Sequence, residues 1–336
     1  MHKNFQKFNS LYEKERKKID RRLKRLLAKR QPLSLYKPGS YILDSPGKRL
    51  RPLLVLFSVK SVGGKLSQAY NAAAAVELLH NFTLVHDDIM DNADKRRGRA
   101  TLHKKYDTNT AILTGDSLLS VAYENLLKDV SDNKRSNGNC KAVVTSFTKS
   151  LVEVCEGQSL DKEFETRKYV PIAEYKLMIK KKTAAMMEMC CNIGAYIGNG
   201  SKEEINSLTR FGRNLGIAFQ MQDDLLDVIG DESKLGKSVG SDIVEGKKTY
   251  LFLKAFEKAK GDDKKKLNKL IINKGISRSQ VSEYQQIYRK LGVIEDAQRE
   301  VKSYTDKALN SLGVLKRKED REFFTWLADL LISRNK

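Results

Sequence analysis

Two acidic motifs of the same form dominate the chemistry that this sequence can support. Residues 87–91 read Asp-Asp-Ile-Met-Asp, and residues 223–227 read Asp-Asp-Leu-Leu-Asp. On a helix, the first and last aspartates of each motif project from the same face, one turn apart. Ionised carboxylates this close together in apolar surroundings need a compensating cation. Mg²⁺ fits this need, because it takes oxygen ligands and keeps positions for water and phosphate.

Each motif follows an apolar stretch with helical spacing. Residues 71–86 are mostly small or apolar on all sides, and residues 215–222 carry no charged side chain. Such stretches are typical of buried helices. Either motif alone is compatible with a solvated acidic turn, but two acidic clusters at the ends of buried helices favour a metal site.

Basic side chains lie close to the first motif and elsewhere in short clusters. Residues 46–52 read Pro-Gly-Lys-Arg-Leu-Arg-Pro, and Lys95, Arg96, Arg97 and Arg99 follow the first motif. Arginine forks and lysine ammonium groups bind phosphate oxygens well, although solvated loop charge is the alternative. The sequence therefore predicts a polyanionic, phosphate-bearing ligand beside the metal.

The positions of the helix-breaking prolines and the spacing of apolar residues predict the fold class. The five prolines of the 336-residue chain all lie at or before position 171, and apolar spacings of three and four recur nearly throughout. We expect an all-α protein, a single large helical bundle around a central cavity in which the two acidic motifs oppose each other. The expected helices cover residues 3–29, 48–62, 67–91, 108–128, 140–164, 172–198, 203–229 and 247–259, followed by shorter helices.

The formal charge of +21 raises the alternative of a nucleic-acid-binding protein. The basic residues are spread along the whole chain without a recognition motif, which disfavours it. The basic N-terminal helix has a partial apolar stripe that fits either an anionic membrane surface or packing against the bundle. The stripe consists of Phe5, Phe8, Leu11, Tyr12, Ile19, Leu23, Leu26 and Leu27.

Cysteine usage and hydropathy predict the compartment. Four cysteines, two of them adjacent at 190 and 191, do not form a disulfide framework, so we expect reduced thiols. No apolar run approaches the length of a membrane span, and we expect no signal peptide at the start of the chain. We expect a cytoplasmic protein with at most peripheral membrane contact.

From about residue 30 to the C-terminus, the chain resembles the trans-isoprenyl diphosphate synthases of the polyprenyl synthetase family. The motifs that carry the resemblance occur in family order and spacing at residues 47–52, 84–91, 96–98, 115–116, 182–183, 220–227 and 246–250. One departure is Leu251, where the family usually has proline. The resemblance implies the isoprenoid synthase fold, one polyprenyl synthetase domain over residues 1–336 in which residues 1–29 add a basic helix, and a homodimer.

The resemblance also implies a reaction: Mg²⁺-dependent condensation of isopentenyl diphosphate with an allylic diphosphate (dimethylallyl, geranyl or farnesyl). The metal ligands would be Asp87, Asp91 and Asp223, supported by Asp88, Asp224 and Asp227, with three Mg²⁺ ions per site. Arg96, Lys182, Lys237 and Lys247 would hold the allylic diphosphate, while Thr183 and Gln220 would stabilise the carbocation. Lys48, Arg51, His80 and Arg97 would hold the diphosphate of the second substrate without metal.

Several alternatives stay open within this resemblance. His80 also fits a buried structural histidine, and His86 fits a residue that orients Asp87. Phe82 and Thr83, one turn before the first motif, resemble the chain-length floor of archaeal geranylgeranyl diphosphate synthases, although Phe82 also fits a core residue. A farnesyl or longer-chain synthase, a terpene cyclase and a non-catalytic prenyltransferase subunit are the alternative functions.

Overall fold

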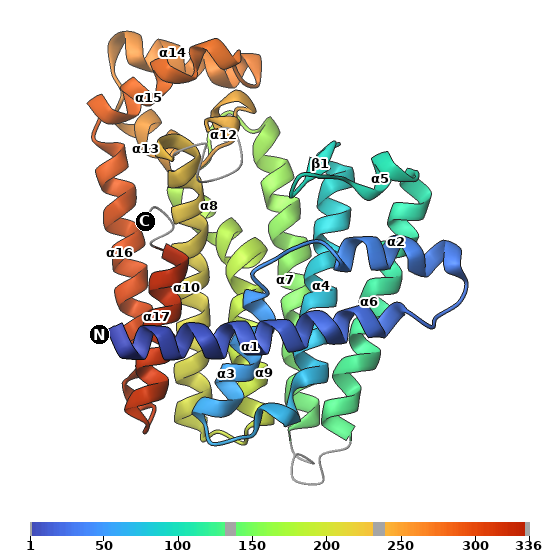
Figure 1. Cartoon of the computed structure of the whole chain (residues 1–336). Helices are drawn as coiled ribbons and strands as arrows, with labels where there is room; N and C mark the ends of the chain where they lie inside the picture. The colour runs from blue at the N-terminus through green and yellow to red at the C-terminus, as the bar shows by residue number, and fades with distance from the viewer. Residues whose placement is uncertain (1, 132–138, 231–238, 333–336) are drawn as a thin grey trace. The chain divides into compact units, whose positions relative to one another are not determined.

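The structure is a computed structural model that describes residues 2–131, 139–230 and 239–332. In this described part, helices account for the regular structure except for one two-stranded hairpin (Figure 1). The predicted all-α class is confirmed. Among the described helices, none combines the length and the apolar character that a membrane crossing requires.

The chain forms two compact units. Unit 1 contains Met1–Phe147 and Cys190–Asn206, and unit 2 contains Thr148–Met189 and Ser207–Lys336. Three helices contribute residues to both units: α7 (Cys140–Thr166), α9 (Ala185–Ile197) and α10 (Lys202–Ile229). The expectation of one domain over residues 1–336 stays a prediction.

Unit 1 is built around α4, the helix that carries the first acidic motif. Ala72, Ala73, Ala74 and Ala75 of α4 have no exposed surface, and α4 packs against α3 and α6. Small side chains let neighbouring helices approach α4 on every side, as its apolar sequence predicted. The elements of unit 1 are α1 (His2–Leu27), α2 (Leu33–Leu43), α3 (Leu50–Ser61), the 3₁₀ helix η1 (Leu66–Gln68), α4 (Tyr70–Met90), β1 (Lys95–Arg96), β2 (Arg99–Ala100), α5 (Leu102–Lys105) and α6 (Thr108–Ser131).

The N-terminal helix α1 packs on α2, α3 and α4 (Figure 1). Most of its apolar stripe is buried in this contact, because Phe8, Tyr12, Ile19, Leu23 and Leu27 are each at most 5% exposed. Of the two readings of the stripe, packing within the protein is therefore the one that the structure supports.

Unit 2 carries the second acidic motif near the end of α10. Its apolar core includes Met221 and Leu225 of α10 together with Tyr175 and Leu251, which are all at most 2% exposed. Its further elements are α8 (Ile172–Ile179), the π-helix η2 (Lys180–Ala184), α12 (Ser241–Val244), α13 (Tyr250–Lys258), α14 (Gly261–Asn273), the 3₁₀ helix η3 (Arg278–Gln280), α15 (Val281–Lys290), α16 (Val293–Ser311), the 3₁₀ helix η4 (Leu312–Val314) and α17 (Lys318–Ile332).

The structure contains the short helices α5 and α12, which were not expected, and it departs further from expectation at α2 and η2. Helix α2 was not expected, because it contains Pro38 in its interior, where proline cannot donate a backbone hydrogen bond. The single helix expected over 172–198 is interrupted by the π-turn η2. Helix ends otherwise fall within a few residues of expectation, and α13 begins at Tyr250 with Thr249 as its N-cap, beside the unusual Leu251.

Candidate active site

The first acidic motif ends α4 and presents its aspartates in different environments. Asp91 is the exposed C-cap residue, Asp87 is partly exposed, and Asp88 is 2% exposed. Nε of Arg96 donates to Oδ1 of Asp88 at 2.6 Å. Burial raises the pKa of Asp88 more than Arg96 lowers it. Asp88 thus anchors the following hairpin, whereas Asp87 and Asp91 lie on the solvent side.

Two arginines of the hairpin β1–β2 contact different parts of unit 1, the first acidic motif and the segment at Pro46. Its strands pair Arg96 with Arg99, and the two turn residues Arg97 and Gly98 have φ values of 52° and 76°. A two-residue turn with positive φ at both positions matches the twist of a hairpin. Arg96 turns back to the acidic motif, while Arg97 donates to the carbonyl of Pro46 at 3.2 Å.

The four residues predicted for the metal-free diphosphate lie around one loop. This loop, residues 44–49, contains Lys48 and leads into α3, where Nη1 of Arg51 lies 3.2 Å from Nε2 of His80 on α4. Loss of solvation, followed by Arg51 and Arg97, lowers the pKa of His80 well below its usual value. His80 is therefore a neutral imidazole near pH 7, and it accepts a hydrogen bond from Arg51. Arg97 reaches the same loop through Pro46.

The second acidic motif belongs to a chain of hydrogen bonds in unit 2. Thr183 Oγ1 donates to Gln220 Oε1 at 2.8 Å, and Gln220 Nε2 donates to Asp224 Oδ1 at 2.8 Å. Tyr175 Oη donates to the other oxygen of Asp224 at 2.6 Å. Burial, followed by the charge of Asp242, raises the pKa of Asp224 to about 8. A bound cation would favour the ionised carboxylate and offset this rise.

The two remaining aspartates of the second motif differ in their environments. Asp223 is partly exposed, whereas Asp227 is 2% exposed and accepts a hydrogen bond of 2.9 Å from the backbone nitrogen of Asp242. Asp227 therefore fastens the start of α12 to the end of α10. Oδ2 of Asp227 is therefore engaged in a contact within unit 2, whereas Asp223 has exposed surface.

Lys182 and Thr183 are displayed by the π-turn η2. A β-carbon on Gly157 of α7 would lie 2.2 Å from the backbone nitrogen of Lys182, and one on Gly216 of α10 would lie 2.5 Å from Cα of Ala184. The two glycines thus allow the turn to sit close to both helices. π-turns recur at functional sites, and this one directs the ammonium group of Lys182 to the carboxylate of Asp161.

Two further lysines were predicted to bind the allylic diphosphate. Lys247 is paired with Glu245 at 2.8 Å and with Asp242 at 3.3 Å. Burial alone would lower the pKa of Lys247, but these two carboxylates outweigh it and raise the pKa. Lys237 lies outside the described residues.

Phe82 and His86, which lie one helical turn apart on α4, form an aromatic pair just before the first motif. Their ring centroids are 4.6 Å apart, and Phe82 is 9% exposed. Nε2 of His86 lies 3.5 Å from the carbonyl of Ile112 and 3.7 Å from Asp116, so His86 turns toward α6. A β-carbon on Gly115 would meet the His86 ring at 2.4 Å. Thr83, beside Phe82, donates to the carbonyl of His80.

Sequence reasoning missed several residues that the structure brings into the site. Tyr175 supports Asp224, Asp161 pairs with Lys182, and Asp242 pairs with Lys247. Gln158, on the same face of α7 as Asp161, has both amide atoms buried and without a partner among the described residues. No spacing rule in the sequence marks Tyr175 or Asp242. Gln158 and Asp161, by contrast, are polar residues one helical turn apart on α7, and this spacing could have identified them as candidate site residues.

The aspartates of the two motifs fit a metal ion whose remaining ligands are water and phosphate oxygens of a substrate. Within the described part of the chain, no three His, Cys, Asp or Glu side chains gather closely enough to hold a metal ion by themselves. Mg²⁺ is usually bound by one or two carboxylates together with water and phosphate oxygens. Asp87 with Asp91, and Asp223, offer such carboxylates. An all-α protein with these carboxylate motifs and with arginines and lysines near them has the features expected of an enzyme that binds phosphate-bearing ligands through divalent ions.

Comparison with known proteins agrees with this class. Residues 32–291 match the Polyprenyl synthetase family. The chain is 42% identical to the short chain isoprenyl diphosphate synthase of Methanocaldococcus jannaschii, with 79% of each chain covered. It is 40% identical to the geranylgeranyl diphosphate synthase of Methanosarcina mazei, with 94% of each covered. The chain therefore belongs to the polyprenyl synthetase family, as its motifs predicted, and it is a prenyltransferase.

Solved structures show the same fold. The crystal structure of geranylgeranyl pyrophosphate synthetase from Pyrococcus horikoshii matches with a TM-score of 0.89 and 39% identity, covering 97% of each chain. A polyprenyl synthase from Caulobacter crescentus, crystallised with calcium and isoprenyl diphosphate, matches with a TM-score of 0.88 and 25% identity, covering 99% of this chain and 98% of that one. The expected isoprenoid synthase fold is thus confirmed.

Proposed function

We propose that this chain catalyses the Mg²⁺-dependent condensation of isopentenyl diphosphate with dimethylallyl, geranyl and farnesyl diphosphates, with geranylgeranyl diphosphate (C20) as its main product. One observation carries the proposal: the arginines of unit 1 that we propose as diphosphate ligands fall into two groups. Arg96 pairs with Asp88 of the acidic motif, whereas Arg51 contacts His80 and Arg97 donates to the carbonyl of Pro46. Two groups of cations suit two diphosphates. The family membership and the names of the relatives support the same reaction.

The allylic diphosphate would be bound through metal. Three Mg²⁺ ions, held by Asp87, Asp91 and Asp223, would neutralise the diphosphate and make it a better leaving group. Asp88, Asp224 and Asp227 would keep those ligands in place through the contacts described above. Arg96, Lys182, Lys237 and Lys247 would donate to the same diphosphate, and Lys182 would exchange Asp161 for a phosphate oxygen.

The bond changes then need positioning and charge stabilisation rather than a nucleophilic side chain. The allylic C–O bond breaks, and its electron pair leaves with the diphosphate. The double bond of isopentenyl diphosphate supplies the pair for the new C–C bond, and the proton lost afterwards passes to the departed diphosphate. The dipoles of Thr183 and Gln220, which are fixed by their mutual hydrogen bond, would stabilise the intermediate cation.

Isopentenyl diphosphate would be bound without metal by Lys48, Arg51, His80 and Arg97. Neutral His80 accepts from Arg51 and so orients its guanidinium, which leaves the charge of the site to the lysine and the two arginines. Phe82, with Thr83 beside it, would close the floor of the channel for the growing chain at C20.

The decisive test incubates the purified protein with labelled isopentenyl diphosphate and each of the three starters, with and without Mg²⁺, and measures product chain length. Magnesium-dependent C20 product is expected. Farnesyl or longer products would keep the reaction and overturn the role of Phe82. Release of hydrocarbon without elongation would identify a terpene cyclase, and no turnover from any starter would identify a non-catalytic subunit.

We also propose that the protein is a homodimer in the cytoplasm. Helix α6 exposes three large apolar side chains, Ile112, Leu113 and Leu127, at 40%, 61% and 43%, and a partner copy would cover them. Light scattering after size exclusion should give twice the chain mass for the wild type and a monomer for Leu113→Lys. A monomeric wild type would contradict the proposal.

Contact with anionic lipid is a further proposal about partners. The outward face of α1 carries the exposed cations Arg21, Lys24 and Arg25, whereas most of its apolar stripe packs inward and Phe5 is exposed. Binding would therefore be electrostatic and would weaken with salt. Flotation with vesicles containing phosphatidylserine tests this proposal. If a nucleic-acid gel shift shows the same salt dependence, the basic surface attracts polyanions without specificity for lipid.

A further inference from the structure

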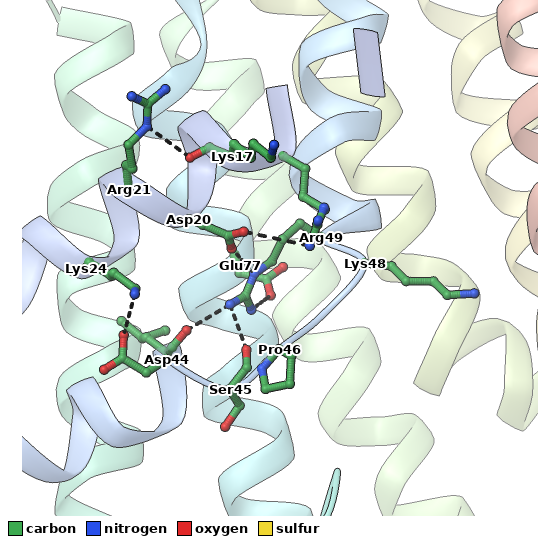
Figure 2. Close-up of polar contacts among 12 residues, drawn as sticks. Lys17, Asp20, Arg21, Lys24, Asp44, Ser45, Pro46, Lys48, Arg49 and Glu77 are labelled. Carbon is green, nitrogen blue, oxygen red and sulfur yellow. Dashed lines mark hydrogen bonds and ion pairs between the residues drawn. The ribbon is translucent and has the colours of Figure 1, made fainter. Parts of the chain in front are cut away.

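Arg49 is the centre of a buried polar cluster in unit 1. Its guanidinium donates to Asp20 Oδ1 at 2.8 Å, to Glu77 Oε1 at 2.7 Å, and to the carbonyls of Leu43 and Ser45 at 2.8 and 2.9 Å. Figure 2 shows the side chain among acceptors from α1, from α4 and from the chain segment that precedes it. One buried residue therefore ties three segments together.

The backbone at Arg49 is held in an uncommon conformation. Its φ of 48° and ψ of 37° lie in the left-handed region, which a residue with a β-carbon seldom adopts. Arg49 nevertheless begins α3, because its carbonyl accepts from the nitrogen of Leu53. The hydrogen bonds of the Arg49 side chain offset the free-energy cost of this backbone conformation. If those contacts weaken, the loop can relax towards ordinary angles.

The residues beside Arg49 are those proposed to bind isopentenyl diphosphate. Lys48 precedes it, and its side chain extends away from the Arg49 cluster in Figure 2. Arg51 follows by two residues and contacts His80. Any change in the backbone at Arg49 therefore redirects both cations.

Helix α1 reaches this loop at two points, although it lies before the region matched by the family. Asp20 binds the Arg49 side chain, and the hydroxyl of Tyr12 donates to the carbonyl of Lys48. The two acceptors of Arg49 differ in environment: the side chain of Glu77 is 4% exposed and that of Asp20 is 30% exposed. Loss of Asp20 leaves Arg49 paired with Glu77, whereas loss of Arg49 strands a buried carboxylate.

We propose that Asp20 of α1, acting through Arg49, is a positioning residue that sets Lys48 and Arg51 for the diphosphate of isopentenyl diphosphate. The inference rests on the proposed function. It assigns the N-terminal helix a part in binding one substrate. Asp20 touches neither substrate, and its effect is transmitted by the Arg49 guanidinium and the left-handed backbone.

The test is steady-state kinetics of the full-length wild type and Asp20→Ala, varying each substrate while the other is saturating. Loss of one charge-assisted contact predicts an increase of about five- to tenfold in KM for isopentenyl diphosphate. The KM for farnesyl diphosphate and kcat should stay within about twofold. Asp20→Glu keeps the carboxylate and should restore most of the affinity.

Glu13→Gln is the matched control, because Glu13 lies on the same helix and pairs with Arg16. Asp20 also lies 4.0 Å from Arg16, so this control measures what disturbance of Arg16 alone does. It should leave both KM values unchanged. Equal increases of both KM values in Asp20→Ala, or no increase in either, would overturn the inference.

Failure of the proposed reaction is recognised separately. If the wild type elongates no starter, calorimetric titration with isopentenyl diphosphate in the absence of metal replaces the kinetics. Weaker binding to Asp20→Ala than to wild type and Glu13→Gln supports the inference without the reaction. Absence of binding to the wild type, or equal binding to all three proteins, overturns it.

Discussion

Gly157 lies so close to Lys182 that a β-carbon at position 157 would be 2.2 Å from the Lys182 backbone nitrogen. The clash is with backbone, so no side-chain rotation relieves it. We predict that Gly157→Ala displaces the π-turn, lowers kcat more than tenfold and lowers the free energy of unfolding by about 1–3 kcal/mol. Product formation and urea unfolding measure the two effects. Gly313→Ala, with nothing within 4 Å of the new atom, should match the wild type.

Tyr175→Phe removes one of the two side-chain hydrogen bonds of buried Asp224 while keeping the ring in place beside Tyr250. Because Asp224 belongs to the second acidic motif and is proposed to support its metal ligand Asp223, we expect kcat to fall by about tenfold and the Mg²⁺ concentration for half-maximal rate to rise. Titration of the rate with Mg²⁺ measures both quantities. An unchanged Mg²⁺ dependence would show that Tyr175 serves only packing.

Phe82→Ala removes the ring that contacts His86 and that we propose as the channel floor. The expected result is products longer than C20, detected by mass analysis, with the rate of isopentenyl diphosphate consumption largely retained. Phe147→Leu, at a buried position whose ring packs against Tyr123, controls for general loosening and should keep the wild-type product. An unchanged distribution in Phe82→Ala would make Phe82 a core residue.

The lowered pKa of His80 predicts a pH dependence of stability. In the unfolded chain His80 takes up a proton below its ordinary pKa of 6.5, but in the folded chain it stays neutral until far lower pH. The unfolded state then binds more protons, so stability decreases as pH falls below 6.5, by at most about 1.4 kcal/mol per pH unit from this group. Urea unfolding of wild type and His80→Gln at pH 7 and pH 5 measures the difference. Parallel losses in both proteins would refute the assignment.

Removal of metal should separate the two substrates. With EDTA, we expect the protein to retain affinity for isopentenyl diphosphate, because its proposed ligands are lysine, arginine and neutral histidine. Affinity for farnesyl diphosphate should fall by at least about tenfold, since its charge would remain uncompensated. Calorimetry with each ligand, with and without Mg²⁺, measures this. Equal losses for both ligands would place metal at both diphosphates.

The sequence predicted the helical class, the position of the motifs at the ends of α4 and α10, and most helix boundaries, because apolar periodicity and proline positions govern these features. The grouping of Arg51 with His80 was likewise predicted from the resemblance. The sequence could not reveal the π-turn, since its residues have ordinary helical propensities and the turn depends on the close contacts at Gly157 and Gly216. Helix α2 was missed because Pro38 normally argues against a helix interior.

The environments of the aspartates were also beyond sequence reasoning. Both motifs have the same spacing, yet Asp88 pairs with an arginine, whereas Asp224 at the matching position accepts from Tyr175 and Gln220. These differences arise from segments that fold back onto the motifs. The sequence does not show which residues of those segments will contact which aspartate. Arg49 is a similar case: it lies between two residues predicted to bind phosphate, but its side chain turns to Asp20 and Glu77 instead.

The hairpin β1–β2 has a thermodynamic consequence. Arg96, which pairs with the first acidic motif, and Arg97, which reaches the loop of Lys48, are joined by one peptide bond in a tight turn. A diphosphate that draws one arginine towards it therefore shifts the other. The affinities for the two substrates should be linked, and linkage is reciprocal: the factor by which the first substrate changes the affinity for the second must equal the factor in the opposite direction.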